Sequence, residues 1–441
     1  MPLPEKFFVE TYGCQMNEHD SEQMCELLER QGLGKADAIE QADVIVINTC
    51  AIREKAEHKV YSSLGKLKSL KINKPETIIV VAGCVAQQQK QDLLNKFRHL
   101  DLVMGTHQIS KLPSLVTKIK QKRERISAVE FVNNIESLHM SALRYSSNRV
   151  CSYVTIMQGC SNFCSYCVVP YTRGKESSRR LEEILEEVSE LASRGIKEIT
   201  LLGQNVNAYG KDLYNFRRFG DLLQRLSSAT GIKRIRFTTS HPKDFDSALV
   251  EAISSSEKVC EHMHLPLQSG SDKVLKAMRR GYCFSEYLEK IELLRTKIPT
   301  CSMTADIIVG FPGESEDDFE DTMDALRRIR FDQIFSFKYS SRPGTVAEKM
   351  PGQIPEETKK ERLTKVHAVQ DSITETWHKN LEGSIQEVLV EGNGRLLNQF
   401  YGRTRTNKIV NFDDDGSISL GDVVRVRVLR GLKHSLLGSI V

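Results

Sequence analysis

The sequence has no long hydrophobic run. Of its 441 residues, 40% are hydrophobic and 27% are charged, and no apolar stretch is long enough to span a bilayer. The start of the chain, Met1 to Glu10, also lacks the basic segment followed by an apolar segment that marks a secretory signal. We therefore expect a cytoplasmic protein without a membrane partner, in which the cysteines stay reduced and free to bind metal.

The sequence also has little excess charge. A net charge of +4 is too small to indicate nucleic-acid binding by itself, although it permits local basic patches. The length suggests about three domains. Cysteine, in contrast, is abundant, because a chain without an export signal carries 11 of them. Their placement is therefore the next question.

Three cysteines lie within eight residues of one another in the segment Gly159 to Cys167. Cys160, Cys164 and Cys167 have the spacing C-x3-C-x2-C. Three thiolates leave a cubane iron–sulfur cluster one ligand short, so that one iron stays open for another molecule. Zinc is the alternative, but a closed zinc site needs a fourth ligand, and the nearest candidate, Cys151, lies beyond an apparent strand.

At this motif the sequence resembles the radical S-adenosylmethionine (SAM) superfamily, in which an aromatic residue precedes the last cysteine, as Tyr166 does here. The resemblance implies that SAM binds the open iron through its amino and carboxylate groups. It also implies reductive cleavage of SAM to a 5'-deoxyadenosyl radical. Cys160, Cys164 and Cys167 would then hold a [4Fe-4S] cluster.

The first domain, residues 1–120, repeats a strand, a cysteine and a helix. Repeated β-α units predict an open parallel α/β sheet, whose strand ends meet at one crevice. Each cysteine could instead be a small buried hydrophobe, but three in succession favour a second three-thiolate cluster. The strands expected are Phe7–Tyr12, Val44–Asn48 and Ile78–Ala82, followed by Cys14, Cys50 and Cys84. We interpret the other cysteines as structural: Cys25, Cys151, Cys260, Cys283 and Cys301.

The segment Lys111 to Tyr145 is weakly patterned and basic, and we expect a linker with an edge strand there. The second domain, residues 145–375, then alternates six strands with helices, which predicts an open partial (β/α)6 barrel. Its strand-terminal loops carry amides, hydroxyls and glycines suited to a small polar ligand, although ordinary glycine turns would look similar. The loops that carry Gln268, Ser269 and Gly310 resemble radical SAM methylthiotransferase motifs around the cofactor. With the amides of Gln204 and Asn205, these residues are the candidate cofactor-binding residues.

The last part, residues 376–441, has several short strands separated by glycine and aspartate turns, which predicts a small β-barrel. Basic residues interleave with these strands, and scattered arginine and lysine suit an RNA backbone. A solvated strand face explains the charge equally well. Gly392, Gly402-Arg403-Thr404 and Gly421-Asp422 resemble the TRAM domain, which binds RNA. The basic residues are Arg395, Arg403, Arg405, Lys408, Arg425, Arg427, Arg430 and Lys433.

Taken together, the chain resembles the radical SAM methylthiotransferases, and the string from Asn48 to Ala56 resembles their tRNA branch. The resemblance implies two [4Fe-4S] clusters, with Cys14, Cys50 and Cys84 holding the auxiliary one. It implies methylthiolation at C2 of N6-isopentenyladenosine at position 37 of tRNA, beside the anticodon. It further implies a monomer served by a reductant such as a flavodoxin or ferredoxin, and by iron–sulfur assembly proteins.

Two alternatives compete with this interpretation. A sister methylthiotransferase would modify a ribosomal-protein aspartate or threonylcarbamoyl-adenosine in tRNA, and the string from Asn48 to Lys55 argues against both. An RNA-binding iron–sulfur protein without activity is the second alternative. It would not cleave SAM under reduction. Opening an aromatic C–H bond requires a radical cofactor rather than ordinary acid–base groups, which favours the enzyme.

Overall fold

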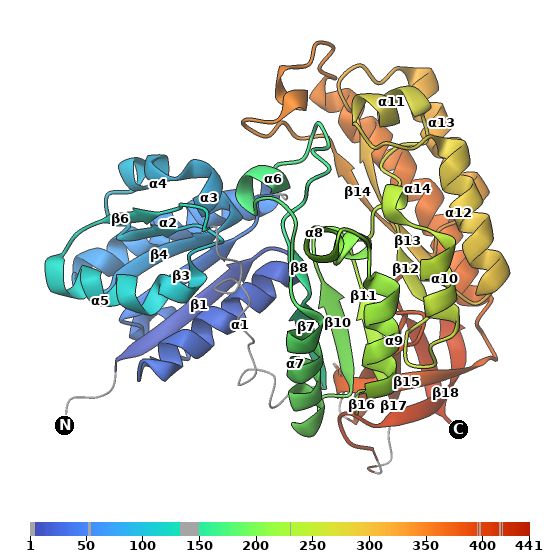
Figure 1. The fold of residues 1–441 in the computed structure, drawn as a ribbon, viewed down its shortest axis with the longest axis horizontal. Helices are drawn as coiled ribbons and strands as arrows, with labels where there is room; N and C mark the ends of the chain where they lie inside the picture. The colour runs from blue at the N-terminus through green and yellow to red at the C-terminus, as the bar shows by residue number, and fades with distance from the viewer. Residues whose placement is uncertain are drawn as a thin grey trace.

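The computed structural model describes residues 5–51, 54–132, 150–229, 231–394, 396, 398–413, 416 and 418–441. Figure 1 shows an α/β part in blue, a larger α/β part in green to orange, and a small β part in red. This confirms the predicted fold class. Ile52 and Arg53 of the tRNA-branch string, and Arg395 of the basic set, lie outside the described residues. No helix in the described part is both long and apolar enough to cross a membrane.

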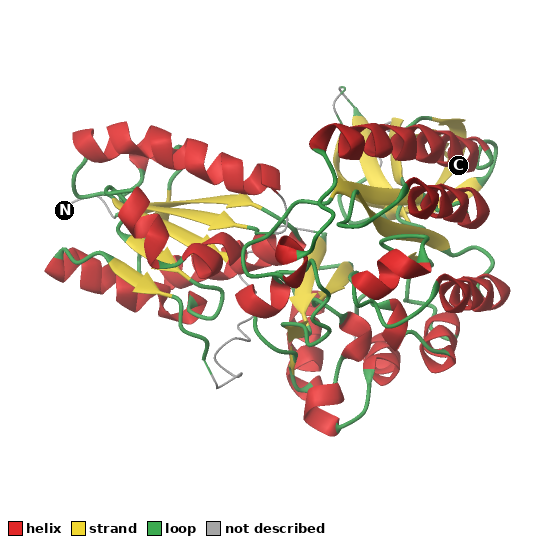
Figure 2. Cartoon of the chain, turned by 90° about the horizontal axis from the view of Figure 1, so that it is seen from above, coloured by secondary structure: helices red, strands yellow, loops and turns green. Residues whose placement is uncertain are grey.

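The first part is a six-stranded parallel sheet with the order β2-β1-β3-β4-β5-β6. Helices cover both of its faces (Figure 2). The central strands β3 and β4 are buried along their whole length, as expected for a parallel sheet covered on both sides. The strands are β1 Lys6–Tyr12, β2 Gly34–Lys35, β3 Val44–Thr49, β4 Ile78–Gly83, β5 Leu102–Met104 and β6 Ile126–Ala128. The helices are α1 Gln15–Arg30, α2 Glu54–Asn73, α3 Cys84–Gln89, α4 Gln91–Lys96 and α5 Leu112–Lys122.

The segment after Lys111 begins with a helix that we did not expect, and its part from residue 133 to 145 lies outside the described residues. Helix α5 buries Leu112, Val116 and Ile119 against the sheet. These three apolar residues have helical spacing, but the pattern spans only two turns and is followed by a basic stretch, which hid it. The expected edge strand is present as β6, which pairs with β5.

The second part is an open parallel barrel made of two three-stranded sheets, β7-β10-β11 and β12-β13-β14. One isolated bridge, from Ile235 to Val259, joins the sheets at the seam between β11 and β12 among the described residues. The strands are β7 Cys151–Thr155, β10 Glu198–Leu202, β11 Arg234–Phe237, β12 His262–His264, β13 Ser302–Val309 and β14 Gln333–Lys338, with a short hairpin of β8 Met157–Gln158 and β9 Ser177–Ser178. The helices are α6 Val169–Thr172, α7 Leu181–Ser193, α8 Lys211–Tyr214, α9 Phe219–Ala229, α10 Ser247–Ser254, α11 Asp272–Ala277, α12 Phe284–Lys297, α13 Glu316–Ile329 and α14 Glu356–Lys379.

The third part is a closed five-stranded barrel with the order β15-β16-β17-β19-β18. Helix α14 leads into it, and its last turn is joined to the barrel by a hydrogen bond between His378 Nδ1 and the carbonyl of Leu432. The core is a small apolar cluster that includes Phe412 and Val426. The strands are β15 Ile385–Asn393, β16 Gln399–Thr404, β17 Ile409–Asp413, β18 Val423–Gly431 and β19 Leu436–Ile440.

This small barrel packs against the starts of the large barrel's strands. Arg234 and Arg236, at the start of β11, donate to main-chain carbonyls of β15, β16 and the turn after β16. From the other side, Arg405 pairs with Glu261, and Lys408 pairs with Asp332. The small barrel therefore bonds to both halves of the large one, on either side of the seam.

Candidate active site

Cys14, Cys50 and Cys84 lie at the carboxyl ends of three neighbouring strands. Cys14 caps α1 after β1, Cys50 follows β3 directly, and Cys84 begins α3 after β4. Because β1, β3 and β4 are adjacent and parallel, their ends meet at one edge of the sheet. A side-chain hydrogen bond links Cys14 to Cys50, and the Cys84 and Cys14 thiols interact electrostatically. The sheet thus brings the three thiols together.

Two asparagines and a glycine determine how these strand ends approach. Asn48 Nδ2 donates to the Asn17 carbonyl at 2.8 Å, and Asn17 Nδ2 donates to the Thr49 carbonyl at 3.2 Å, which ties α1 to the end of β3. Gly83 has φ +90°, and a Cβ there would lie 2.4 Å from Asn48 Oδ1. Only glycine fits this conformation and this space, so Cys84 depends on it for its position.

The electrostatic environment of the first thiol group includes an arginine from the second part of the chain. The hydrogen bond with Cys50, aided by the Arg173 charge, lowers the pKa of Cys14 to about 6. Burial raises the pKa of Cys84, and the Arg173 charge opposes that rise. Arg173 pairs with Asp20 of α1 at 2.6 Å, and both side chains are buried. A deprotonated Cys14 is the form that binds metal.

Cys160, Cys164 and Cys167 lie on the loop after β8, at the carboxyl end of the first barrel strand. Gly159 precedes them with φ +80°, and its N–H donates to Gln204 Oε1. The Cys160 N–H donates to the carbonyl of Gly174 at 3.1 Å, and the Cys167 N–H donates to the carbonyl of Cys164 at 3.0 Å. These bonds hold the three thiols on one tight turn.

A buried arginine also lies beside the second thiol group. Arg280 Nη1 is 3.4 Å from the Cys164 sulfur, and its Nη2 donates to the Pro266 carbonyl at 3.0 Å. Burial raises the pKa of Cys167 to about 12 and that of Cys160 to about 11. The neighbouring Cys164 raises both further, which shows that the thiols share one small volume.

The five candidate cofactor residues differ in how their polar atoms are used. Asn205 is fully buried and donates to Asp244 at 2.8 Å, and Ser269 bonds to Thr322 at 3.2 Å. Gln204 supports the cysteine loop, as described above. Gln268 is 6% exposed and adopts φ +77°, and its Oε1 has no hydrogen-bond partner among the described residues.

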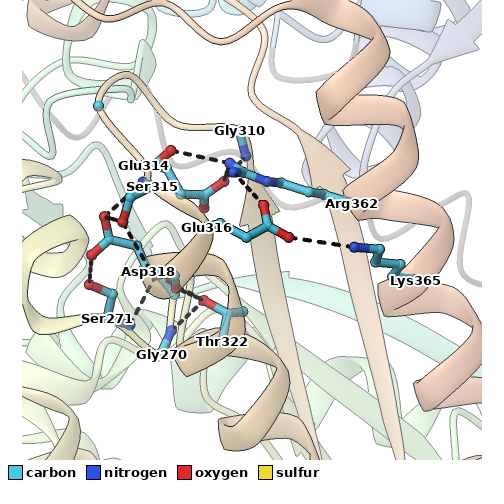
Figure 3. Close-up of polar contacts among 12 residues, drawn as sticks. Gly270, Ser271, Gly310, Glu314, Ser315, Glu316, Asp318, Thr322, Arg362 and Lys365 are labelled. Carbon is cyan, nitrogen blue, oxygen red and sulfur yellow. Dashed lines mark hydrogen bonds and ion pairs between the residues drawn. The ribbon is translucent and has the colours of Figure 1, made fainter.

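Gly310 and the loop after β12 are held by one polar network (Figure 3). The Gly310 N–H donates to Glu314 at 2.6 Å, and Arg362 of α14 pairs with Glu314 at 2.7 Å. Asp318 accepts from Ser271 at 2.7 Å and so joins the two loops. The network therefore fixes the loops that carry Gln268, Ser269 and Gly310 relative to each other.

The zinc alternative lacks its fourth ligand. Cys151 begins β7, at the opposite end of the strand from the cysteine loop. Its ligand atom lies within 4.8 Å of those of Glu198 and Glu391. Arg236 pairs with that same Glu198 at 2.8 Å, so an arginine charge already balances this cluster. Cys151 therefore does not complete a four-ligand site with Cys160, Cys164 and Cys167.

Each thiol group fits an iron–sulfur cluster with three protein ligands. Both groups are gathered at strand ends; Cys50, Cys84 and Cys164 are buried, and the other three thiols are partly buried. In each group an arginine compensates the negative charge that the thiolates would carry. Gln268 Oε1 and Asn205 Oδ1, which have no hydrogen-bond partner among the described residues, also leave two buried acceptors for a polar ligand. The two thiol groups are therefore candidate metal sites, and the loops at the barrel mouth are a candidate site for a polar ligand.

The basic residues of the small barrel divide into two groups. Arg405 and Lys408 form ion pairs with Glu261 and Asp332 of the large barrel, so they belong to the docking face rather than to an open RNA surface. Arg403 pairs with Glu391 inside the small barrel. Exposed side chains on β18 alternate with the buried Val426 and Val428. These are Arg425, Arg427 and Arg430.

Three family models match consecutive parts of the chain. Residues 6–105 match the uncharacterized protein family UPF0004, residues 154–326 match the radical SAM superfamily, and residues 379–441 match the TRAM domain. The radical SAM methyltransferase TsrM from Kitasatospora setae has a similar fold, with a TM-score of 0.58 at 14% identity over 78% of this chain and 75% of that chain. The fold and the cysteine loop thus define a radical SAM enzyme with a TRAM domain.

Curated relatives narrow this class. The tRNA-2-methylthio-N(6)-dimethylallyladenosine synthase of Carboxydothermus hydrogenoformans is 45% identical and covers 99% of both chains. The synthase of the same name from Syntrophus aciditrophicus is 48% identical over 98% of this chain and 94% of its own. The chain belongs to the family of tRNA-2-methylthio-N(6)-dimethylallyladenosine synthases.

Two site residues were missed in the sequence. Arg173 pairs with Asp20, which lies 153 residues earlier in the chain. Arg280 contacts Cys164, which lies 116 residues earlier. A buried arginine has no periodic signature. The one available signal for Arg173 was its place six residues after Cys167, on the loop that leaves the cysteine motif.

Proposed function

We propose that this protein replaces the C2 hydrogen of N6-isopentenyladenosine, at position 37 of tRNA, with a methylthio group. Three findings support this function: the family membership, the radical SAM fold and the two gathered sets of three thiols. The thiol sets carry the most weight, because a sulfur transfer needs a place for sulfur next to the place where the radical is made.

We propose that Cys160, Cys164 and Cys167 hold a [4Fe-4S] cluster that binds SAM, and that Cys14, Cys50 and Cys84 hold an auxiliary [4Fe-4S] cluster. When bound, SAM supplies both the transferred methyl group and the 5'-deoxyadenosyl radical that an aromatic C–H bond requires. Gln204, Asn205, Gln268, Ser269 and Gly310 remain the proposed cofactor contacts. Gln268 and Asn205 are the best supported of these, because Gln268 Oε1 and Asn205 Oδ1 are buried acceptors without a hydrogen-bond partner among the described residues.

The tRNA base would enter from the open side of the large barrel, beside β14. This edge strand exposes Phe335 and Phe337, at 44% and 39%. The Phe335 ring packs edge to face against the ring of His264 in β12, with 5.9 Å between the ring centroids. The two side chains therefore lie on the same face of the sheet. Exposed aromatic rings suit stacking with a nucleobase. Arg425, Arg427 and Arg430 on β18 would meet backbone phosphates.

A set of single-cysteine variants tests this proposal. Reconstituted protein is incubated anaerobically with SAM, a reductant and isopentenylated tRNA, and nucleosides and 5'-deoxyadenosine are measured by mass spectrometry. The parent should give both the methylthio product and deoxyadenosine. Cys164→Ala should give neither, whereas Cys84→Ala should still release deoxyadenosine without methylthiolation. Cys260→Ala removes a buried thiol outside both sets and should behave as the parent.

The outcomes separate the alternatives. Deoxyadenosine without a methylthio product from the parent would move the substrate to a sister class. No deoxyadenosine from a parent with intact clusters would refute the radical reaction. A Cys84→Ala variant that methylthiolates at the parent's rate would refute the role of the first thiol group. A reductant such as flavodoxin or ferredoxin, iron–sulfur assembly proteins and a monomeric state in the cytoplasm complete the proposal.

A further inference from the structure

Arg173 belongs to the radical SAM part of the chain but lies in the first thiol site. It follows α6, six residues after Cys167, and its side chain is 4% exposed. Its main chain is fixed against the first sheet by two contacts. His107 Nε2 lies 3.0 Å from the Arg173 carbonyl, and Thr106 Oγ1 donates to the Thr172 carbonyl at 2.6 Å. The loop that carries Arg173 packs against the first part of the chain and therefore places the arginine in this site.

One side of the guanidinium is paired and the other is not. Nη2 donates to Asp20 at 2.6 Å. Nη1 is buried and has no hydrogen-bond partner in the part of the chain that the structure describes. A buried donor of a charged group that is left without an acceptor is destabilising. Such a donor indicates that a further acceptor belongs next to Nη1.

Arg173 lies beside the thiols of this site, because α6, which ends at Thr172, packs against α3, which begins at Cys84. The second thiol group offers a parallel, since Arg280 Nη1 lies 3.4 Å from the Cys164 sulfur. Each set of three thiols thus has one buried arginine beside it.

We propose that Arg173 is a positioning residue for the auxiliary cluster, donating Nη1–H to a sulfur of that cluster and stabilising its reduced form. This inference rests on the proposed function, because it requires the second cluster. A cluster held by three thiolates carries negative charge, and reduction adds one more. A guanidinium in a buried site offsets that charge, so removing it makes reduction harder. Hydrogen bonds to the sulfurs and nearby charge are what tune such potentials.

The test measures the reduction potential of the auxiliary cluster alone. A full-length background with Cys160→Ala, Cys164→Ala and Cys167→Ala removes the other cluster, and iron and sulfide analysis counts the one that remains. An EPR-monitored potentiometric titration then compares R173Q, R173K and D20N in this background. R234Q is the matched control, because Arg234 is equally buried and ion-paired but lies at the opposite ends of the barrel strands.

R173Q should lower the ratio of reduced to oxidised cluster at a fixed potential about tenfold, which is about 59 mV for one electron. R173K should recover most of this change, and R234Q should cause none. D20N leaves the guanidinium without its anion and should shift the ratio the other way. If R173Q does not retain iron, D20N and R173K carry the comparison.

An unchanged potential in R173Q, or in D20N where R173Q holds no iron, would overturn the role of Arg173. An equal shift in R234Q would mean that the loss of any buried arginine has this effect, and would overturn it too. A background protein that binds no iron would instead remove the auxiliary cluster from the proposed function. The two failures are therefore distinguishable before any titration is made.

Discussion

The contact between the two barrels makes a quantitative prediction for Arg236→Met. Arg236 donates to Glu198 at 2.8 Å and to the carbonyls of Thr404 and Arg405 at 2.7 and 2.9 Å. Removing one partner of a buried ion pair costs about 3–5 kcal/mol, because the other charge is left unpaired. We expect the lower value, about 3 kcal/mol, because Arg234 remains 3.9 Å from the second oxygen of Glu198.

Trp377 provides the assay. It is the single tryptophan of the chain, lies near the end of α14, and donates to the Arg330 carbonyl at 2.9 Å. Its fluorescence therefore reports on the junction between the barrels. If the free energy of unfolding falls by about 2–3 kcal/mol per molar urea, a loss of about 3 kcal/mol in stability should lower the urea midpoint by about 1–1.5 M. Binding of tRNA should weaken in the same variant, while SAM cleavage continues.

Two further variants decide what causes the loss. Arg225→Met removes an exposed pair with Asp221 and should cost about 0.3–0.5 kcal/mol. Adding Glu198→Gln to Arg236→Met removes the unpaired charge and should recover part of the midpoint. A midpoint for Arg236→Met equal to that of Arg225→Met would refute the reasoning. So would a double variant that is less stable than Arg236→Met alone.

Three other predictions follow from single residues. In Gly159→Ala, the new Cβ would lie 2.0 Å from the Lys175 carbonyl, so iron per chain should fall sharply; Gly195→Ala has a similar φ, +95°, but no atom within 4 Å, and should keep its iron. His19 is buried, and burial lowers its pKa to about 3. Below about pH 6.5, His19 therefore becomes protonated in the unfolded chain but stays neutral in the folded chain. Stability should therefore fall as the pH drops from 6.5 toward 3, by up to about 1.4 kcal/mol per pH unit from this group, and urea midpoints at pH 7.5 and 5.5 should differ less in His19→Gln. Phe335→Ala should raise the KM for tRNA about tenfold through lost stacking, and unchanged steady-state kinetics would contradict a contact with the base.

Local sequence patterns predicted the elements that depend on neighbours in the chain. The strand before Cys50 and the strand before Cys84 were expected because a buried parallel strand reads as a short apolar run. Their adjacency followed from β-α order, which is why the meeting of three thiols could be foreseen. Helix α5 was missed because its apolar residues are few and three lysines occupy its last five positions.

Contacts between distant segments were not predictable in the same way. Arg405 looked like an RNA contact, since a basic residue on a strand does not reveal its partner. Its partner, Glu261, is 144 residues away in the chain. Arg173 was invisible for the same reason. Ion pairs between domains depend on the final packing, which periodicity and spacing do not encode.

Because the small barrel contacts both sides of the seam between β11 and β12, the effect of deleting it needs a different interpretation. Arg234 and Arg236 lie on one side of the seam, and Glu261 and Asp332 lie on the other, and all four bond to the small barrel. A chain cut before β15 would remove the main-chain acceptors of Arg234 and Arg236, which would keep only Glu198, and would leave Glu261 and Asp332 without the cations they pair with. It would also lose the part that bridges the two half-barrels. Loss of activity on such truncation would therefore measure damage to the catalytic barrel as much as loss of RNA affinity, and point variants on β18 are the cleaner probe.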